Sequence, residues 1–277
     1  MTTGEVAVEG LRAPARRGWR RLVQRGDGRA PVWIELAVMA WLFWLYDVIN
    51  NLEPTRRALA LANARGMLDF ERSLGIDIER AVDRWLDGHS VLAFVATYYY
   101  FFAHVIVTLA VLVLLWWRRP RDYPRLRTQL VIVNLIAFAV FWRYPLAPPR
   151  MLPGYEDVVA STHAVISWHS GALVHQADQY AAMPSLHLAW AGWSALGLVA
   201  LWPRPWVRAL GALHVLLTAV VVIATGNHWL LDLVAGFGTL IAGVLLQRAL
   251  WRAWRLRRRR VTLPELGERG AAERVGA

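Results

Sequence analysis

The chain has 277 residues, of which 57% are hydrophobic and none is cysteine, and its 31 basic residues, all arginine, give a formal net charge of +11. The hydrophobic fraction excludes a disordered chain, and the lack of cysteine excludes disulfide frameworks, thiolate metal sites and cysteine nucleophiles. Long apolar runs between charged segments indicate a membrane protein.

In chain order, the apolar runs predict an all-α, polytopic membrane protein with six membrane-spanning helices. Each run is close to the ~20 residues that a helix needs to cross the hydrocarbon core. The runs cover about residues 32–50, 90–117, 127–147, 184–202, 207–226 and 229–250. They define a membrane domain at 32–250, between basic tails at 1–31 and 251–277. The segment 51–89 has apolar residues at helical spacing among charges, which predicts one or two short amphipathic helices on the membrane surface.

The arginines distinguish the two sides of this bundle. The two tails and the loops after the second and fourth spans carry 23 of them, whereas the other side carries 8 together with ten acids. The positive-inside bias predicts a multi-pass protein of the cell membrane with both termini in the cytoplasm and three loops outside. Because the inner arginines flank spans, we expect them to contact anionic lipid head groups and not nucleic acid.

Several ionisable residues fall in or near the spans, where charge is costly. We expect Glu35 and Asp47 to be interfacial or paired carboxylates, and His104 and His214 to be packing residues. His163, His169 and His175 recur in an outer loop without a carboxylate partner at metal-ligand spacing, so no metal and no cofactor are expected. Their role stays open.

Three clusters converge on the predicted outer face. They are Arg143 to Arg150, Met183 to His187, and Thr225 to Asp232. His228 and Asp232 are four residues apart, so a helix places them in contact, and the carboxylate would orient the imidazole. The three clusters together supply two histidines, one carboxylate and two arginines.

This set predicts phosphoryl transfer without a metal. His228 is the candidate nucleophile, Asp232 its orienting group and His187 the acid that protonates the leaving oxygen. Arg143 and Arg150 would hold phosphate oxygens. With Pro184 at the first helical position, the amides of Ser185 and Leu186 would form an anion site at a helix N-terminus.

The clusters resemble the signature of the type 2 phosphatidic acid phosphatase superfamily. Arg143-x6-Arg150 keeps the spacing of the first motif with arginine for lysine and Met151 for proline, and Pro184-Ser185-Leu186-His187 has leucine for glycine. His228-x3-Asp232 matches the end of the third motif, but Val221 and Val222 replace its Ser-Arg. These departures look like the inositol phosphorylceramide synthase branch, which includes transferases of phospho-head groups.

The resemblance implies a membrane lipid as substrate and a phosphohistidine-type intermediate on His228, resolved by water or an alcohol. With the third-motif arginine missing, Arg143, Arg150, the helix amides and Asn227 would hold the phosphate. Lipid phosphotransferase and lipid or polyprenyl phosphate hydrolase both stay open, as does a non-catalytic transporter or scaffold. The lipid, its head group and the oligomeric state are not predicted.

Overall fold

The computed structural model describes residues 31–51, 56–162 and 179–275, with side chains as far as residue 257. These residues form helices and connecting turns, and no strand occurs among them. The helices are α2 (Val32–Asn50), α3 (Arg57–Ser73), α4 (Glu79–Asp87), α5 (Ser90–Arg118), α6 (Tyr123–Arg143), η2 (Pro149–Met151), α7 (Val158–Ser161), α8 (Leu186–Leu201), α9 (Pro205–Ala224) and α10 (Leu230–Val275).

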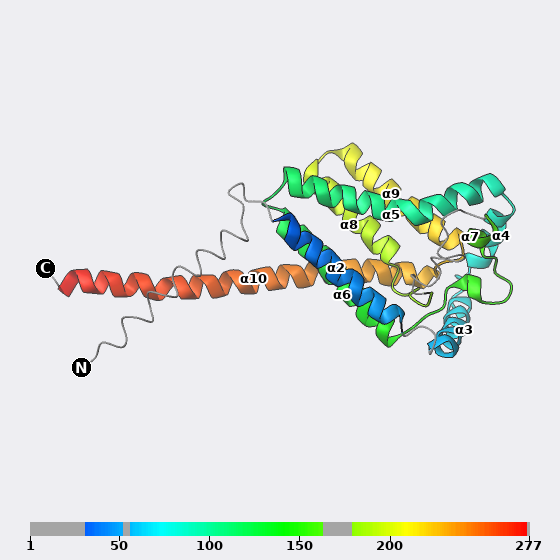
Figure 1. The fold of residues 1–277 in the computed structure, drawn as a ribbon, viewed down its shortest axis with the longest axis horizontal. Helices are drawn as coiled ribbons and strands as arrows, with labels where there is room; N and C mark the ends of the chain where they lie inside the picture. The colour runs from blue at the N-terminus through cyan, green and yellow to red at the C-terminus, as the bar shows by residue number, and fades with distance from the viewer. Residues whose placement is uncertain (1–30, 52–55, 163–178, 276–277) are drawn as a thin grey trace.

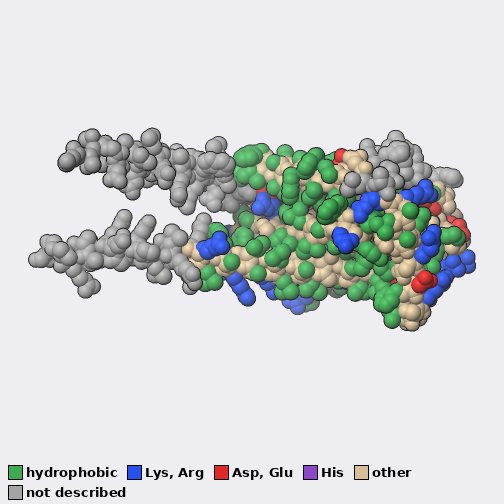
Figure 2. All heavy atoms as spheres, turned by 90° about the horizontal axis from the view of Figure 1, so that it is seen from below, with side chains coloured by type: hydrophobic (Ala, Val, Ile, Leu, Met, Phe, Trp, Pro, Cys, Tyr) green, Lys and Arg blue, Asp and Glu red, His purple; other side chains and the backbone are tan. Residues whose placement is uncertain are grey.

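The predicted all-α, polytopic membrane architecture is confirmed. Within the described residues, five helices are long and apolar enough to cross a membrane: α2, α5, α6, α9 and α10. The remaining predicted span, the fourth along the chain, corresponds to α8, a shorter apolar helix of 16 residues. Figure 2 shows hydrophobic side chains over the middle of the molecule, with arginines and acids gathered at the end that carries α3 and α4.

Helix α8 lies inside the bundle and contacts α5, α6, α9 and α10. Its apolar residues are joined to the neighbours by a few buried polar bonds. Trp193, which is fully buried, donates its indole N–H to the carbonyl oxygen of Leu126 at 3.0 Å, and the hydroxyls of Ser194 and Thr108 are 3.0 Å apart. A buried polar group needs such a partner, so these bonds fix how α8 is rotated against α5 and α6.

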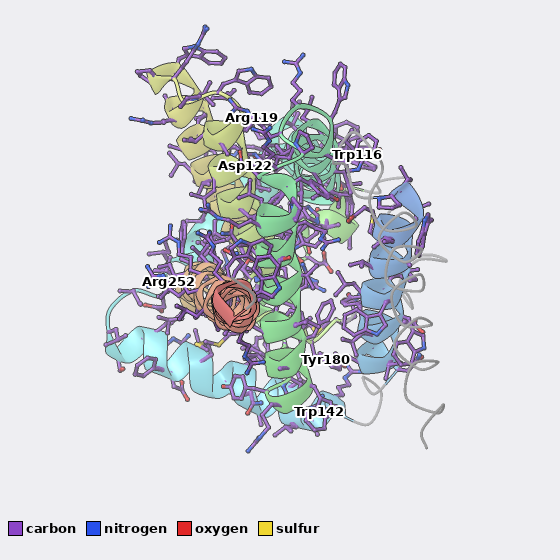
Figure 3. All side chains as sticks on the ribbon, turned by 90° about the vertical axis from the view of Figure 1, so that its left-hand side faces the viewer. Trp116, Arg119, Asp122, Trp142, Tyr180 and Arg252 are labelled. Atoms are coloured by element: carbon purple, nitrogen blue, oxygen red, sulfur yellow. The ribbon has the colours of Figure 1, made fainter. Side chains whose placement is uncertain are left out.

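Helix α2 lies at the edge of the bundle. Figure 3, a view nearly along α10, shows α6 between α2 and α10, and α2 packs on α6. The guanidinium of Arg127 on α6 forms an ion pair with Glu35 on α2 at 2.8 Å. Glu35 is thus a paired carboxylate, as expected, and Asp47 accepts a bond from the Asn51 amide at 3.2 Å.

Helices α3, α4 and α7 gather at one end of the bundle, where α5 begins, α9 ends and α10 begins (Figure 1). Of these, α3 and α4 are the two helices predicted for 51–89. Arg56, at the start of α3, donates to the carbonyl oxygens of Phe141 and Trp142, the last turn of α6. This bond satisfies helix-end carbonyls and ties α3 to the bundle.

Helix α10 continues well past residue 250, where the sequence predicts the membrane domain to end and the basic tail to begin. It is one helix from Leu230 to Val275, and it extends beyond the other helices in Figure 1. The sequence places a boundary there because apolar residues give way to arginines, but arginine is a good helix former and does not interrupt the backbone.

Candidate active site

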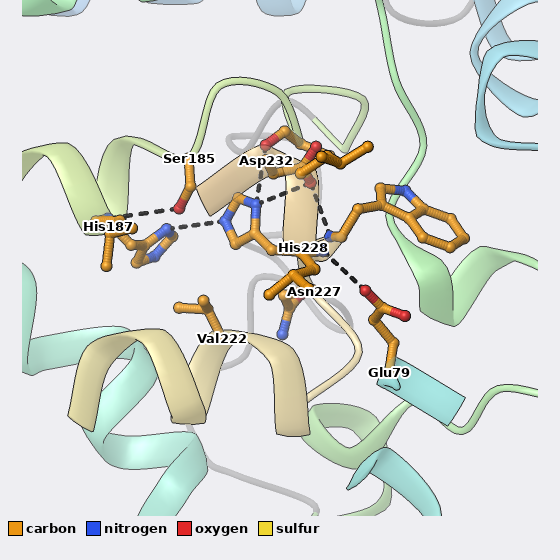
Figure 4. A network of polar contacts seen from close by, with 12 residues as sticks. Glu79, Ser185, His187, Val222, Asn227, His228 and Asp232 are labelled. Carbon is orange, nitrogen blue, oxygen red and sulfur yellow. Dashed lines mark hydrogen bonds and ion pairs between the residues drawn. The ribbon is translucent and has the colours of Figure 1, made fainter. Parts of the chain in front are cut away.

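The starts of α8 and α10 meet at the α3–α4 end of the bundle. The backbone N–H of Ser185, which precedes α8, donates to the carbonyl oxygen of Asp232 in the first turn of α10 at 3.0 Å. Gly236 makes this approach possible, because a Cβ there would lie 2.6 Å from the carbonyl oxygen of Ser185. The junction brings His187 beside His228 (Figure 4).

His228 lies in the turn before α10, not on the helix, but its predicted contact with Asp232 is formed. Its Nδ1 is 2.8 Å from the carbonyl oxygen of Ala182 and 3.3 Å from Oδ2 of Asp232. Both neighbours are acceptors, so Nδ1 carries the proton and Nε2 keeps its lone pair in the neutral ring. The side chain is 5% exposed. The imidazole of His228 is therefore in the tautomer that a nucleophile requires, with Nε2 unprotonated.

His187 faces that nitrogen from the first turn of α8. Its Nδ1 is 3.3 Å from Nε2 of His228, and the rings meet edge to face at 5.4 Å. On its other side, the ring of Tyr100 stacks at 4.6 Å and the ring of His104 lies at 4.1 Å. The predicted pairing of the two histidines is thus present, and two side chains of α5 hold His187 in place.

The N-terminus of α10 is capped by carboxylates from three helices. Oδ2 of Asp232 accepts the N–H of Trp229 at 2.9 Å, Oε1 of Glu79 accepts that of Leu230 at 2.8 Å, and Oε1 of Glu71 accepts that of Leu231 at 2.8 Å. All three acids are fully buried. The three side-chain oxygens accept N–H groups that the first turn of a helix leaves without intrahelical partners, so the cap fixes the turn that carries His228.

Burial raises the pKa of Glu71 from 4.5 to about 8, although the bond from Leu231 opposes this, and the neighbouring charge of Glu79 adds to it. Asp83, which accepts the N–H of Glu156 at 3.0 Å, has its pKa raised from 3.8 to about 6, mainly by burial. This end of the bundle therefore holds protonatable carboxyl groups close to neutral pH.

Arg150 supplies the cation of the site. Its guanidinium donates to Oδ1 of Asn227 at 2.9 Å and to Oε1 of Gln179 at 2.6 Å, and it lies 3.5 Å from Oδ2 of Asp157. Its backbone N–H also donates to Gly226. Arg150, Gln179 and Asn227 line the same cavity as the two histidines. The predicted proximity of Arg150 and Asn227 to His228 is therefore present in the structure.

Arg143 is not brought into this site. It is exposed at the last turn of α6, and it is absent from the residues that line the cavity. The chain turns after Tyr144, where Leu146 bonds to the segment at Tyr180 and Ala182, so the two arginines of the first motif are separated. The spacing in the sequence could not show this turn.

The predicted anion site at the start of α8 is partly wrong. The helix begins at Leu186 with Ser185 as its N-cap, so Pro184 is outside the helix. The Ser185 N–H is taken by Asp232, and its hydroxyl accepts from the N–H of Leu188 at 3.4 Å. Among the described residues, the N–H groups of Leu186 and His187 have no hydrogen-bond partner, and these two amides are the donors that α8 offers.

An apolar cavity of about 490 Å³ leads away from the histidines between α2, α5, α6 and α8. Its volume is in the range of small-molecule sites, about 300–1,000 Å³. Polar groups stand at its two ends: Arg150, Gln179, Asn227, His187 and His228 at one, and Glu35 with Arg127 at the other. The walls between them are mainly aliphatic and aromatic, so the cavity suits an apolar chain that carries a polar head.

Sequence reasoning missed several residues of the site. The sequence predicts a packing role for His104, yet His104 lies beside His187 and lines the cavity. Glu71, Glu79 and Gln179 were not singled out, because nothing in the sequence pairs them with residues up to 160 positions away. His214 bonds to the hydroxyl of Tyr99 at 2.9 Å, as expected of a packing residue. His163, His169 and His175 lie outside the described residues.

Val222 occupies the position at which the signature has an arginine. The residue is 1% exposed and its side chain packs in an apolar cluster, while its carbonyl oxygen accepts the N–H groups of Asn227 and His228 at 3.1 and 3.2 Å. The backbone here shapes the turn that presents His228, and the side chain contributes no charge. Among the described residues, no group of three or more His, Asp and Glu is arranged to hold a metal ion.

The fold and the site define a helical membrane protein with a buried histidine–carboxylate pair facing a second histidine. A family model described as PAP2 superfamily matches residues 65–246, which is more than half of the chain. The chain therefore belongs to the PAP2 superfamily, and this membership supports a lipid phosphatase or phosphotransferase type of function in general. Comparisons with curated proteins and with solved structures found no match.

Proposed function

We propose that this protein transfers or hydrolyses the phosphate group of a membrane lipid, with His228 as the nucleophile. The observation that carries the proposal is the line Asp232–His228–His187 at the head of the apolar cavity. Asp232 and Ala182 hold the proton on Nδ1 of His228, which directs the lone pair of Nε2 toward His187 and the cavity. This is the arrangement of base and orienting group that activates a nucleophile.

In the first step, Nε2 of His228 attacks phosphorus and forms a P–N bond as the P–O bond to the leaving group breaks. His187 gives its proton to the leaving oxygen. In the second step, water or an alcohol attacks the phosphohistidine, His187 takes the proton of the attacking O–H, and the P–N bond breaks. Arg150 and the amides at the start of α8 would neutralise the phosphate oxygens during both steps.

The cavity supports a lipid as the substrate. Its apolar wall continues from His187 along α5 and α6, so a phosphate at the histidines can carry a hydrocarbon chain within the protein. The departures of the motifs from the superfamily signature favour a head-group transferase similar to inositol phosphorylceramide synthase. Because transfer and hydrolysis share the first step, a plain lipid phosphate hydrolase is the second candidate.

We also propose an orientation of the protein across the membrane. The 23 arginines on the side of the two tails favour cytoplasmic termini in the cell membrane, with the α3–α4 end and the active site outside. The tails would then contact anionic lipid head groups of the inner leaflet.

The test is turnover of a panel of lipid phosphates and phospholipids by the purified protein and by His228→Ala and His187→Ala. His89→Ala is the matched control, because His89 is exposed at the start of α5 and outside the cavity. The proposal expects both site variants to lose activity and the control to keep it. Full turnover by the two site variants would contradict it, and product analysis with and without a lipid alcohol would separate transfer from hydrolysis.

A further inference from the structure

The apolar cavity has a fixed length. On α6 the residues that line it run from Phe141, near the histidines, to Arg127, and on α2 they run from Tyr46 to Glu35. The fourteen residue-to-residue steps from Arg127 to Phe141 rise roughly 21 Å along the helix axis. A chain whose phosphate lies at His228 would extend along this path toward the opposite end of the bundle.

The far end of the path is closed by an ion pair. Arg127 and Glu35 are 2.8 Å apart, and their side chains are only 25% and 14% exposed. On both α2 and α6, no residue beyond this pair lines the cavity. Charges held away from water are costly to separate, so the pair is a polar floor beneath apolar walls.

The side of the cavity between α2 and α5 opens on the apolar surface of the bundle. Phe43 and Met39 of α2 and Leu109 of α5 line the cavity, yet they are 67%, 44% and 39% exposed. A chain can therefore enter sideways from the lipid, while its length is limited where α2 is tied to α6.

We propose that the Arg127–Glu35 ion pair is a specificity determinant that sets the length of the hydrocarbon chain accepted by the cavity. This inference rests on the proposed function for the nature of the substrate, a phosphate ester with one long chain in the cavity. A chain that ends before the pair packs against aliphatic side chains. A longer chain must press its methyl end against the two charged groups and remove their remaining water, or it must bend out between α2 and α5.

Binding of alkyl phosphonates tests the inference without relying on catalysis. Dissociation constants of octyl, dodecyl, hexadecyl and docosyl phosphonate are measured by calorimetry on the full chain in detergent. The variants are Glu35→Ala/Arg127→Ala, which removes the floor without leaving a lone charge, and Glu35→Arg/Arg127→Glu, which restores a pair. Arg72→Ala/Asp77→Ala is the matched control, since this pair lies at 3.5 Å on the exposed surface away from the cavity.

We expect the wild type to bind the longest chain more weakly than the chain that just reaches the pair. The alanine double variant should change this ratio of dissociation constants by about tenfold or more in favour of the longest chain, because overfilling a packed apolar site costs on that order. The exchanged pair and the surface control should keep the wild-type ratio. A length profile that is the same in the wild type and the alanine double variant would overturn the inference.

A single substitution tests the inference even if the alanine double variant does not fold. Leu42→Trp fills the cavity partway along α2, and it should move the preference toward shorter chains by about the same factor. Wild-type protein that shows no length preference would also overturn the inference. The proposed function would fail separately, through absence of turnover on all lipid phosphates, because phosphonate binding and turnover are independent measurements.

Discussion

Nε2 of His228 and Nδ1 of His187 lie 3.3 Å apart, so no phosphorus atom fits between them until one ring moves. Tyr100 and His104 hold the ring of His187, whereas His228 is fixed by Ala182 and Asp232. A phosphate group that separates the two rings would receive the lone pair of His228 at phosphorus and the proton of His187 at the leaving oxygen. The two histidines therefore have different roles.

The first prediction tests the role of His187 as an acid. His187→Ala should lower kcat on an alkyl phosphate by about 100- to 10,000-fold, the usual contribution of general acid catalysis. On an aryl phosphate with a weakly basic leaving group, the first-turnover release of the aryl alcohol should slow much less, because the departing oxygen needs no proton, whereas the later step, in which His187 is the base, still slows. Pre-steady-state rates of alcohol release from the two substrates give the comparison. Equal losses would show that His187 acts in some other way.

The second prediction concerns Asp232→Asn. The change keeps the volume, but the amide can donate to His228 and so favour the wrong tautomer, and the bond to the N–H of Trp229 weakens. We expect kcat to fall by about 10⁴-fold, as in other histidine–aspartate pairs, with KM little changed. Steady-state kinetics give kcat and KM separately. A rise in KM with kcat unchanged would assign Asp232 to binding instead.

The third prediction separates the two arginines of the first motif. Arg150→Lys should lower kcat/KM by about ten- to a hundredfold, because the ammonium group cannot keep the bonds to Asn227 and Gln179 while it also binds phosphate. Arg143→Lys should have little effect, since Arg143 is exposed outside the cavity. Competition by inorganic phosphate reports binding directly, and equal losses in the two variants would contradict this arrangement.

The fourth prediction is the pH dependence of stability. The pKa of Glu71 is raised from 4.5 to about 8, so the folded protein favours the protonated acid. The contribution of Glu71 to the free energy of unfolding is complete below pH 4.5, and it is lost as the pH rises through about 8. Glu71→Gln keeps an oxygen for the N–H of Leu231 and removes the titration. The variant's melting temperature should fall less than that of the wild type over this range. Parallel curves would contradict the assignment.

The fifth prediction tests the junction of α8 and α10. A Cβ at Gly236 would lie 2.6 Å from the carbonyl oxygen of Ser185, whereas one at Gly238 meets nothing within 4 Å. Gly236→Ala should therefore destabilise the protein by about 1–3 kcal/mol and reduce turnover, because the start of α8 must shift. Gly238→Ala is the control and should melt at or above the wild-type temperature. Thermal unfolding gives the melting temperatures of the two variants, and equal melting temperatures would contradict the prediction.

Much of this architecture is predictable from the sequence because it depends on local pattern. Runs of about twenty apolar residues identify the membrane helices. The four-residue spacing correctly pairs His228 with Asp232, although the contact forms at the turn before α10 and not along a helix face. The predicted start of α8 places His187 at the same end of the bundle as His228. These features depend on periodicity and on helix ends, which a sequence displays directly.

Other features depend on contacts between distant segments and were not predictable. Glu71 and Glu79 cap α10 across 160 and 151 positions, and a buried carboxylate has no local signature among the charges of α3 and α4. Arg143 was misplaced because motif spacing does not show the turn after α6. Ser185 was expected to offer its amide to phosphate, but the partner of that amide is a carbonyl on α10.

In the proposed mechanism, Nε2 of His228 forms a bond to phosphorus. Mass spectrometry of the peptide containing His228, after rapid alkaline quenching of the protein during turnover, detects this bond. We expect a phosphoryl or phospho-head-group adduct on His228, absent from His228→Ala and accumulating in His187→Ala with an aryl phosphate substrate. Turnover without any adduct, or with an adduct on another residue that persists in His228→Ala, would show that His228 is not the nucleophile.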